Sequence, residues 1–273
     1  MHNKLPLFTL LLLVALAGHA QKNVLNAVWR DSTIVINGNP NDWDQPFRYY
    51  DSKAKIQYSV VNDASNLYIS LKTMDDKAQM KILRTGMEVW LDTSGKKKEI
   101  TVVRYPLPGD TKLEWIQDPS EPERSQLERP DLKRMKMDYA LSEKRMKLTG
   151  FKNIPTTVMP VENSYGIEVA IGWDKDDVFT YELKLPFSTF YKEKLVAADT
   201  LKPLTIGVKV GSFDVPQQIS NGSVTDPSAS NTGLRNQGYG NQQAQGSQDM
   251  PMGKINDMAL SLFVQMRMKL AYK

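Results

Sequence analysis

The sequence contains no cysteine, and its two histidines, His2 and His19, both lie within the first twenty residues. Beyond residue 20 the chain therefore cannot form disulfides, thiolate zinc sites, cysteine nucleophiles or a histidine-dependent catalytic triad. It also lacks the cysteine that a lipoprotein anchor requires. The 35 Lys and Arg residues nearly balance the 31 Asp and Glu residues, so the composition does not indicate nucleic-acid binding.

Long hydrophobic runs are also missing, apart from one near the start of the sequence. Residues 1–20 combine Lys4, an apolar stretch from Leu5 to Ala17 and a small-residue ending at Ala20, which is typical of a secretory signal peptide. The apolar stretch is shorter than the ~20 residues of a membrane-spanning helix. We therefore expect a secreted or periplasmic protein without a membrane span, whose mature chain is residues 21–273.

Alternation of apolar and polar residues dominates the rest of the chain and predicts β-strands. The segments "AKIQYSVVND" (54–63) and "NLYISLKT" (66–73) alternate and are linked by the turn cluster at 62–66, which predicts a hairpin. Eight to eleven such strands, each with one apolar face, predict an all-β fold: a single two-sheet antiparallel β-sandwich, jelly-roll-like, over residues 21–273. Helices are expected only at residues 76–83 and at 188–195, the second capped by Ser188.

Two long segments interrupt the strand pattern. Residues 106–132 form a polar excursion, and the alternating stretch that follows, 134–151, is interpreted as a hairpin, with a helix as the alternative. Residues 216–253 are rich in Gln, Asn, Gly and Ser and cannot bury enough apolar surface to fold alone. A loop of this length is either functional or disordered, and we expect disorder.

Several motifs, in order, resemble those of the family 9 carbohydrate-binding modules and the wider DOMON-like sandwich group. They are "TIVINGNPNDWD" (33–44), "KIQYSVVNDASNLYISLKTMD" (55–75), "GMEVWLDTSGKK" (86–97), "YELKLPFSTF" (181–190) and "LTIGVKV" (204–210). Asn37 stands where the opening signature of the family usually has Asp. We expect Trp43 to be structural, packing where the chain turns onto the sheet, with Asp42 accepting hydrogen bonds from turn amides.

The resemblance implies a non-catalytic module that binds a saccharide or polysaccharide between tryptophan side chains. Sugar recognition requires flat apolar surface flanked by planar hydrogen-bonding groups. Trp90 is the leading candidate, because it shares a strand face with Glu88 and Asp92. Trp173 ends an apolar strand and is either a core or a rim residue, and Trp115 lies in the polar excursion.

Other chemistries remain as alternatives. Asp174, Asp176 and Asp177 could bind calcium, although a solvated turn between two strands is the favoured explanation. The thirteen methionines suggest a haem b-binding electron-transfer subunit of the DOMON-like type, but methionine is also ordinary core filling. A structural envelope protein that has lost its ligand is a further alternative. No opposed carboxylate pair of the kind a glycosidase uses is apparent in the sequence, and the sequence leaves the oligomeric state unknown.

Overall fold

The computed structural model describes residues 24–95, 97–108, 129–212 and 260–273. The expected signal peptide (1–20), most of the excursion 106–132 and all of the segment 216–253 lie outside these ranges. Within the described residues, no helix is both long enough and apolar enough to cross a membrane.

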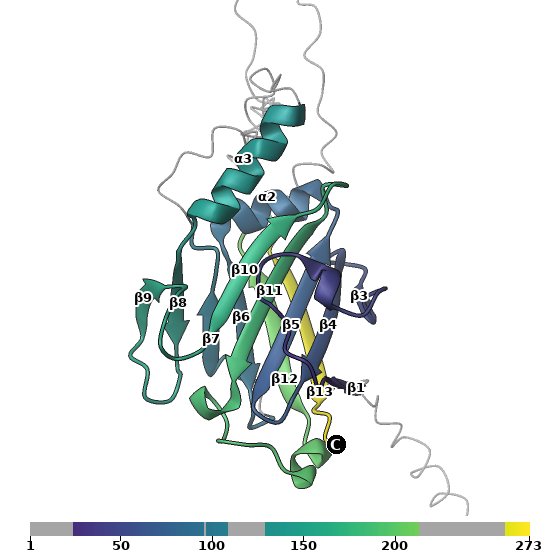
Figure 1. Ribbon diagram of the computed structural model, residues 1–273, viewed down its shortest axis with the longest axis vertical. Coiled ribbons are helices and arrows are strands. Elements are labelled where there is room, and N and C mark those ends of the chain that lie inside the picture. The colour runs from purple at the N-terminus through teal and green to yellow at the C-terminus, as the bar shows by residue number, and fades with distance from the viewer. Residues whose placement is uncertain (1–23, 96, 109–128, 213–259) are drawn as a thin grey trace, which may run out of the picture.

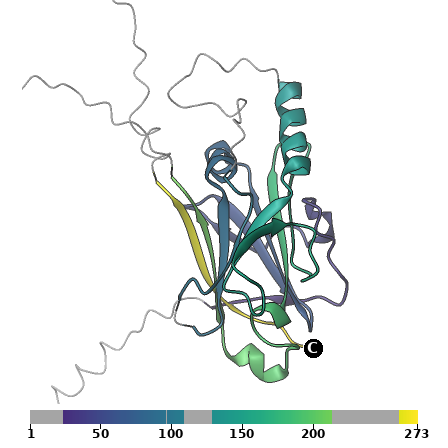
Figure 2. The same cartoon turned by 90° about the vertical axis from the view of Figure 1, so that its left-hand side faces the viewer.

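Two β-sheets pack face to face, so the predicted sandwich is confirmed (Figures 1 and 2). The seven-stranded sheet has the order β1 (Val24–Asn26), β13 (Leu262–Lys269), β12 (Leu204–Val210), β6 (Met87–Asp92), β7 (Thr101–Arg104), β8 (Arg145–Thr149), β9 (Thr157–Pro160). The six-stranded sheet has the order β10 (Glu168–Trp173), β11 (Phe179–Pro186), β5 (Asn66–Thr73), β4 (Ile56–Asn62), β2 (Val28–Trp29), and β3 (Tyr49–Asp51) also pairs with β4. Pairing is antiparallel except at the short pairs β1·β13 and β2·β4, which are parallel.

The predicted hairpin is β4 and β5, which pair antiparallel from Gln57↔Lys72 to Asn62↔Leu67. Asp63 fixes the turn, because one of its carboxylate oxygens accepts hydrogen bonds from the amides of Ser65 and Asn66, each at 2.6 Å. The polar turn cluster therefore sets the register that places the apolar face of both strands toward the core.

The alternating apolar residues of both sheets form one shared core, as their period of two predicts. Strand β13 contributes Val264, Met266 and Met268, all at most 3% exposed. The buried methionines Met87 and Met146 belong to the same core, where their flexible side chains fill space between the sheets.

Helix α2 (Asp76–Thr85) confirms the helix predicted at 76–83. Asp75 caps it by accepting a hydrogen bond from the amide of Ala78 at 2.9 Å, and Gly86 ends it with a positive φ of 77°.

The helix predicted at 188–195 is wrong. Only a 3₁₀ turn, η3 (Phe187–Thr189), forms there, and Ser188 does not cap it. Phe187, Phe190 and Leu195 are buried at irregular spacing, and the amide of Leu195 donates to Ala64 in the β4–β5 turn. Long-range packing therefore overrides the local helix signal; a second 3₁₀ turn, η4 (Ala197–Leu201), follows.

The hairpin interpretation of residues 134–151 is wrong for its first half. Residues Arg129–Ser142 form helix α3, and only Arg145–Thr149 form a strand, β8. Within residues 133–142 of the helix, the buried positions are Lys136 and Tyr139, while Met137 and Leu141 are 50% and 67% exposed. A segment with alternating apolar residues is thus helical, and the buried face of this helix includes a lysine.

The outer face of the six-stranded sheet is covered by residues 34–47, which we call the strap. Ile34, Trp43 and Phe47 of the strap form a small second core with Val61 and Tyr68 of the sheet. The short 3₁₀ helix η1 (Pro40–Asp42) lies within it. Trp43 is 3% exposed, so the prediction that it is structural is confirmed. Asp42 accepts a hydrogen bond from the amide of Val35 at 3.2 Å, as expected.

The carboxylate of Glu182, on β11, fastens the strap to the sheet. It is fully buried and accepts three hydrogen bonds: from the amide of Asn37 at 2.9 Å, from the amide of Gly38 at 2.8 Å and from the indole N–H of Trp43 at 2.7 Å. Burial raises the pKa of Glu182, and the three donors act in the opposite direction. The strap and the sheet are therefore joined through a single buried acceptor.

We predict that Trp43→Phe lowers the free energy of unfolding by about 1–3 kcal/mol, because one bond to a buried carboxylate is lost while a ring still fills the site. Chemical denaturation of the purified protein measures this loss. Trp29→Phe is the matched control, since the indole N–H of Trp29 donates to Asp31 at 2.8 Å at an exposed position and should cost less than about 1 kcal/mol. Equal losses in the two variants would contradict the role given to Glu182.

Candidate functional site

The predicted aromatic platform at Trp90 is not open to solvent. The side chain is 1% exposed and lies flat on β12, where a Cβ at Gly207 would come within 1.9 Å of the indole ring. Phe263 of β13 stacks beside it, with ring centroids 6.5 Å apart. The indole N–H has no hydrogen-bond partner among the described residues. In this conformation the ring cannot stack on a sugar, so the expectation of an exposed platform is wrong.

The carboxylates predicted to flank Trp90 are engaged within the protein. Glu88 lies 3.8 Å from the guanidinium of Arg104. Asp92 is fully buried and accepts hydrogen bonds from the amides of Ser94 and Lys98 at 2.6 and 3.0 Å. Burial opposes ionisation of Asp92, but the hydrogen bonds, led by the one from the Ser94 hydroxyl, outweigh it and hold its pKa below the ordinary value. Asp92 therefore shapes the loop after β6. Trp115 lies outside the described residues.

The three aspartates proposed as calcium ligands do not converge on one point. Asp174 accepts from the amides of Asp176 and Val178 within its own turn, at 2.9 and 3.0 Å. Asp176 lies 3.6 Å from Lys175, and Asp177 binds Lys136 at 2.7 Å. Within the residues that the structure describes, no group of three or more acidic side chains is placed to hold a metal ion.

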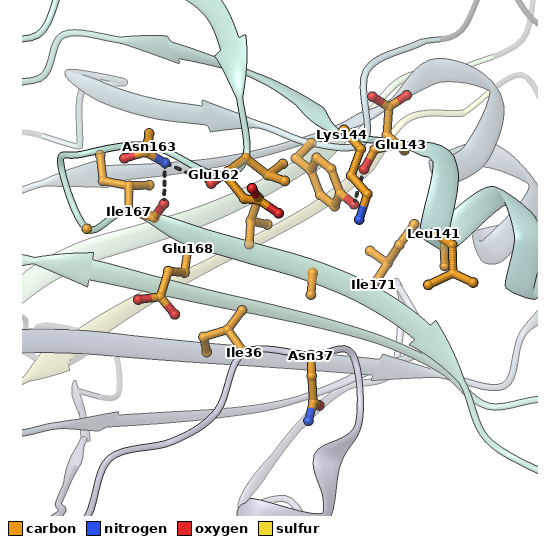
Figure 3. A pocket seen from close by; sticks show the side chains of 16 residues that line it. Ile36, Asn37, Leu141, Glu143, Lys144, Glu162, Asn163, Ile167, Glu168 and Ile171 are labelled. Carbon is orange, nitrogen blue, oxygen red and sulfur yellow. Dashed lines mark hydrogen bonds between the residues drawn. The ribbon is translucent and has the colours of Figure 1, made fainter.

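A cavity of about 520 Å³ lies instead along β10, the outermost strand of the six-stranded sheet. Figure 3 shows that it extends around this strand, with Glu162, Asn163, Lys144 and Glu143 on one side and Ile36, Asn37 and Glu168 on the other. Its walls come from the strap, from the end of α3 and the turn after it, from the loop between β9 and β10, and from Glu168 to Ile171 of β10 itself.

The cavity combines aliphatic surface with polar groups that are held in place. Glu168 accepts a hydrogen bond from Lys184 at 2.6 Å, which leaves its second oxygen available. Asn163 is fixed by donating to the carbonyls of Val161 and Ile167, at 2.8 and 2.7 Å. Tyr105 donates to the carbonyl of Glu143 at 3.1 Å, and burial raises its pKa, so this phenol stays neutral at physiological pH.

A buried lysine holds the wall that α3 contributes. Lys136 has only 8% of its side chain exposed, and its ammonium group contacts both carboxylate oxygens of Asp177 at 2.7 Å and the amide oxygen of Gln79 at 3.3 Å. The indole N–H of Trp173 donates to the same amide oxygen at 2.8 Å, and the Trp173 ring lies 5.8 Å from the ammonium group. Trp173, predicted as a core or rim residue, is thus half-buried and docks α3.

Sequence reasoning missed this cavity because its walls come from distant parts of the chain. The strand predicted in this region is "GIEVAIGW" (166–173), without the residues before it, and the end of α3 falls within the hairpin predicted at 134–151. The one local signal is the segment Glu162-Asn163-Ser164-Tyr165-Gly166, which marks a polar turn at the start of an apolar strand. That signal does not reveal that β10 is an edge strand.

Comparison with known proteins gives a structural likeness but no sequence relative. No protein-family model matches the sequence, and no curated protein matches it. Among solved structures, the fold is similar to a family 9 carbohydrate-binding module from Caldicellulosiruptor kristjanssonii, determined in complex with glucose. The two share 9% sequence identity with a TM-score of 0.33, over 93% of this chain and 98% of that one. At this level of similarity, the comparison assigns no residue of the cavity.

We predict that Lys136→Met loosens the docking of α3 without unfolding the sandwich. The variant loses charge-assisted hydrogen bonds, and Asp177 can be hydrated because its side chain is half exposed, so we expect a local loss of about 1–3 kcal/mol. Native-state hydrogen exchange should show faster exchange in residues 133–142 while β4 and β5 are unchanged. Lys133→Met, at an exposed position of the same helix, is the control. Similar exchange in both variants would show that Lys136 does not hold the helix.

Proposed function

We propose that this chain is a non-catalytic saccharide-binding protein and that the sugar occupies the cavity along β10. The proposal keeps the function expected from the sequence but moves the ligand away from Trp90. The observation that carries it is the composition of the cavity, in which fixed polar groups and aliphatic side chains alternate around one strand.

The size of the cavity suits a small sugar. At about 520 Å³ it falls within the ~300–1,000 Å³ typical of small-molecule sites. Val161, Ile36 and Leu141 offer apolar contact to the C–H groups of a sugar ring, whereas Glu162, Glu168 and Asn37 offer planar groups to its hydroxyls. A purely apolar ligand would leave these polar groups without partners, at a cost of about 1–3 kcal/mol for each one buried.

The arrangement of the carboxylates favours binding over hydrolysis. Glu168 is paired with Lys184, and Glu143 accepts a hydrogen bond from the amide of Arg145 at 3.1 Å. Carboxylates held in this way are good acceptors for sugar hydroxyls, whereas glycoside hydrolysis needs one carboxylic acid that gives up a proton and a second, opposed carboxylate. We therefore propose recognition without bond cleavage.

We predict that one or more neutral monosaccharides in a panel of glucose, xylose, galactose and mannose shift the backbone amide resonances of residues 140–144 and 161–171. Two-dimensional NMR titration of the labelled protein measures both the location of the ligand and its affinity. Binding should lie in the millimolar range, about 4 kcal/mol, because the aromatic side chain that lines the cavity, Tyr105, is only 2% exposed and offers little stacking surface. Shifts centred on β6, β12 and β13 would place the ligand near Trp90 and overturn the proposed location.

We further predict that filling the cavity abolishes this binding. Ala140→Phe adds a ring at a half-buried position that lines the cavity and should weaken the affinity by about tenfold or more. Met137→Phe adds a ring to the same helix at a position that is 50% exposed and outside the cavity, and it should leave the affinity unchanged. Leu141→Glu, at an exposed position of the wall, is a second test if Ala140→Phe loses its fold. Wild-type affinity in folded Ala140→Phe and Leu141→Glu would contradict the proposal.

A further inference from the structure

The unpaired edge of β10 faces the cavity. The pairing with β11 determines which residues of β10 direct their backbone N–H and C=O groups toward that edge. Among the described residues, β10 pairs with β11 alone, in the register Glu168↔Lys184 to Trp173↔Phe179. The next pair of this register is bonded, since the amide of Asp174 donates to the carbonyl of Val178 at 3.2 Å. In an antiparallel ladder such bonded pairs recur at every second residue. Glu168, Ala170 and Gly172 therefore direct their backbone groups toward β11.

The backbone groups of Ile167, Val169 and Ile171 consequently point away from the sheet, along the edge that lines the cavity. The carbonyl of Ile167 already accepts a hydrogen bond from the side-chain amide of Asn163 at 2.7 Å, which confirms this phase. At the other end the strap crosses the strand: Gly38 has a φ of 79°, and a Cβ on it would come within 2.4 Å of the carbonyl oxygen of Ile171. Both ends of the edge are thus occupied by protein.

Val169 lies between these two ends, and its outward backbone groups are not occupied in the same way. Among the described residues, nothing bonds to its outward N–H or to its outward carbonyl. Both groups belong to one extended residue, so they point in the same direction, with the nitrogen and oxygen roughly 3 Å apart. The cavity therefore contains one backbone donor and one backbone acceptor side by side.

We infer that Val169 is the anchor of the ligand site and that it binds two neighbouring hydroxyls of a sugar ring, a vicinal diol. One hydroxyl accepts a hydrogen bond from the N–H, and the adjacent hydroxyl donates one to the carbonyl. Two gauche hydroxyls on adjacent ring carbons have nearly the same spacing as the backbone pair and can serve as donor and acceptor in turn. This inference rests on the proposed function and specifies the chemical group that the site recognises.

The same geometry disfavours an extended peptide. A peptide that adds a strand to an edge bonds to several alternate residues in succession. Here the carbonyls of Ile167 and Ile171 are taken by Asn163 and blocked by Gly38, so the ladder would be limited to Val169. A secondary amide alone also fits poorly, because its N–H and C=O point in opposite directions. A diol satisfies both groups of Val169 without needing the rest of the edge.

The test uses a pair of variants that differ in the Val169 N–H. Val169→Pro removes the N–H. An edge strand tolerates proline at a position where the N–H faces away from the sheet. Val169→Ala also shortens the buried side chain but keeps the N–H, so it is the matched control. With the sugar of the panel that binds the wild type most tightly, we expect Val169→Ala to stay within about threefold of the wild-type affinity. We expect Val169→Pro to bind about tenfold more weakly, as the loss of one hydrogen bond predicts.

Ligand analogues give a second measurement that does not depend on the stability of the proline variant. In the wild type, deoxy derivatives of that sugar lacking either hydroxyl of one vicinal pair should each bind about tenfold more weakly, whereas removal of a distant hydroxyl should matter less. The Val169 amide resonance should move on binding. Equal affinity of Val169→Pro and Val169→Ala, or equal binding of all deoxy derivatives, would overturn the inference while leaving saccharide binding intact. If no sugar binds the wild type, the proposed function itself fails.

Discussion

The buried carboxylate of Glu182 connects the fold to the candidate site. Its three hydrogen bonds hold the strap against the outer face of the six-stranded sheet. An unpaired carboxylate in this position would be costly, so the strap and the sheet must order together. With Gly38 held by this carboxylate, its backbone meets the carbonyl of Ile171 and closes one end of the β10 edge. The length of strand left open to a ligand therefore depends on the hydrogen bonds of Glu182, a residue that does not itself line the cavity.

A second buried charge sets the opposite wall. Lys136 brings α3 against the turn after β10, and the last turn of that helix supplies Ala140 and Leu141 to the cavity (Figure 1). The ammonium group has a carboxylate, an amide oxygen and an aromatic ring around it, so the cost of burying it is offset by several contacts. The strap and α3 are thus each held by one buried ionisable side chain, and the cavity lies between the two elements that these side chains position.

The sequence predicted those features in which a local pattern agrees with the tertiary environment. The alternation in β4, β5 and β13, the turn at Asp63 and the cap at Asp75 all specify structure that long-range packing then reinforces. Helix α3 was kept only as the alternative to a hairpin, because its buried face includes Lys136, which a hydrophobic pattern excludes. The site was missed for a related reason. An edge strand is one that has a neighbouring strand on one side only, and this depends on the whole sheet. No residue of "GIEVAIGW" (166–173) carries that information, because the same alternating pattern fits a central or an edge position.

The exposure of Trp90 depends on the residue beside it in the next strand as much as on the face of its own strand. Its alternation with Val89 and Leu91 correctly places it on the outer face, together with Glu88 and Asp92. Exposure, however, depends on what lies beside it in β12, where Gly207 has no side chain and lets the indole lie flat on the backbone. Trp90 thus packs against the sheet and is not available to a ligand. The sugar binding that we propose at the β10 edge would then rely on hydrogen bonds and aliphatic contact, which favours selectivity for hydroxyl geometry over tight binding.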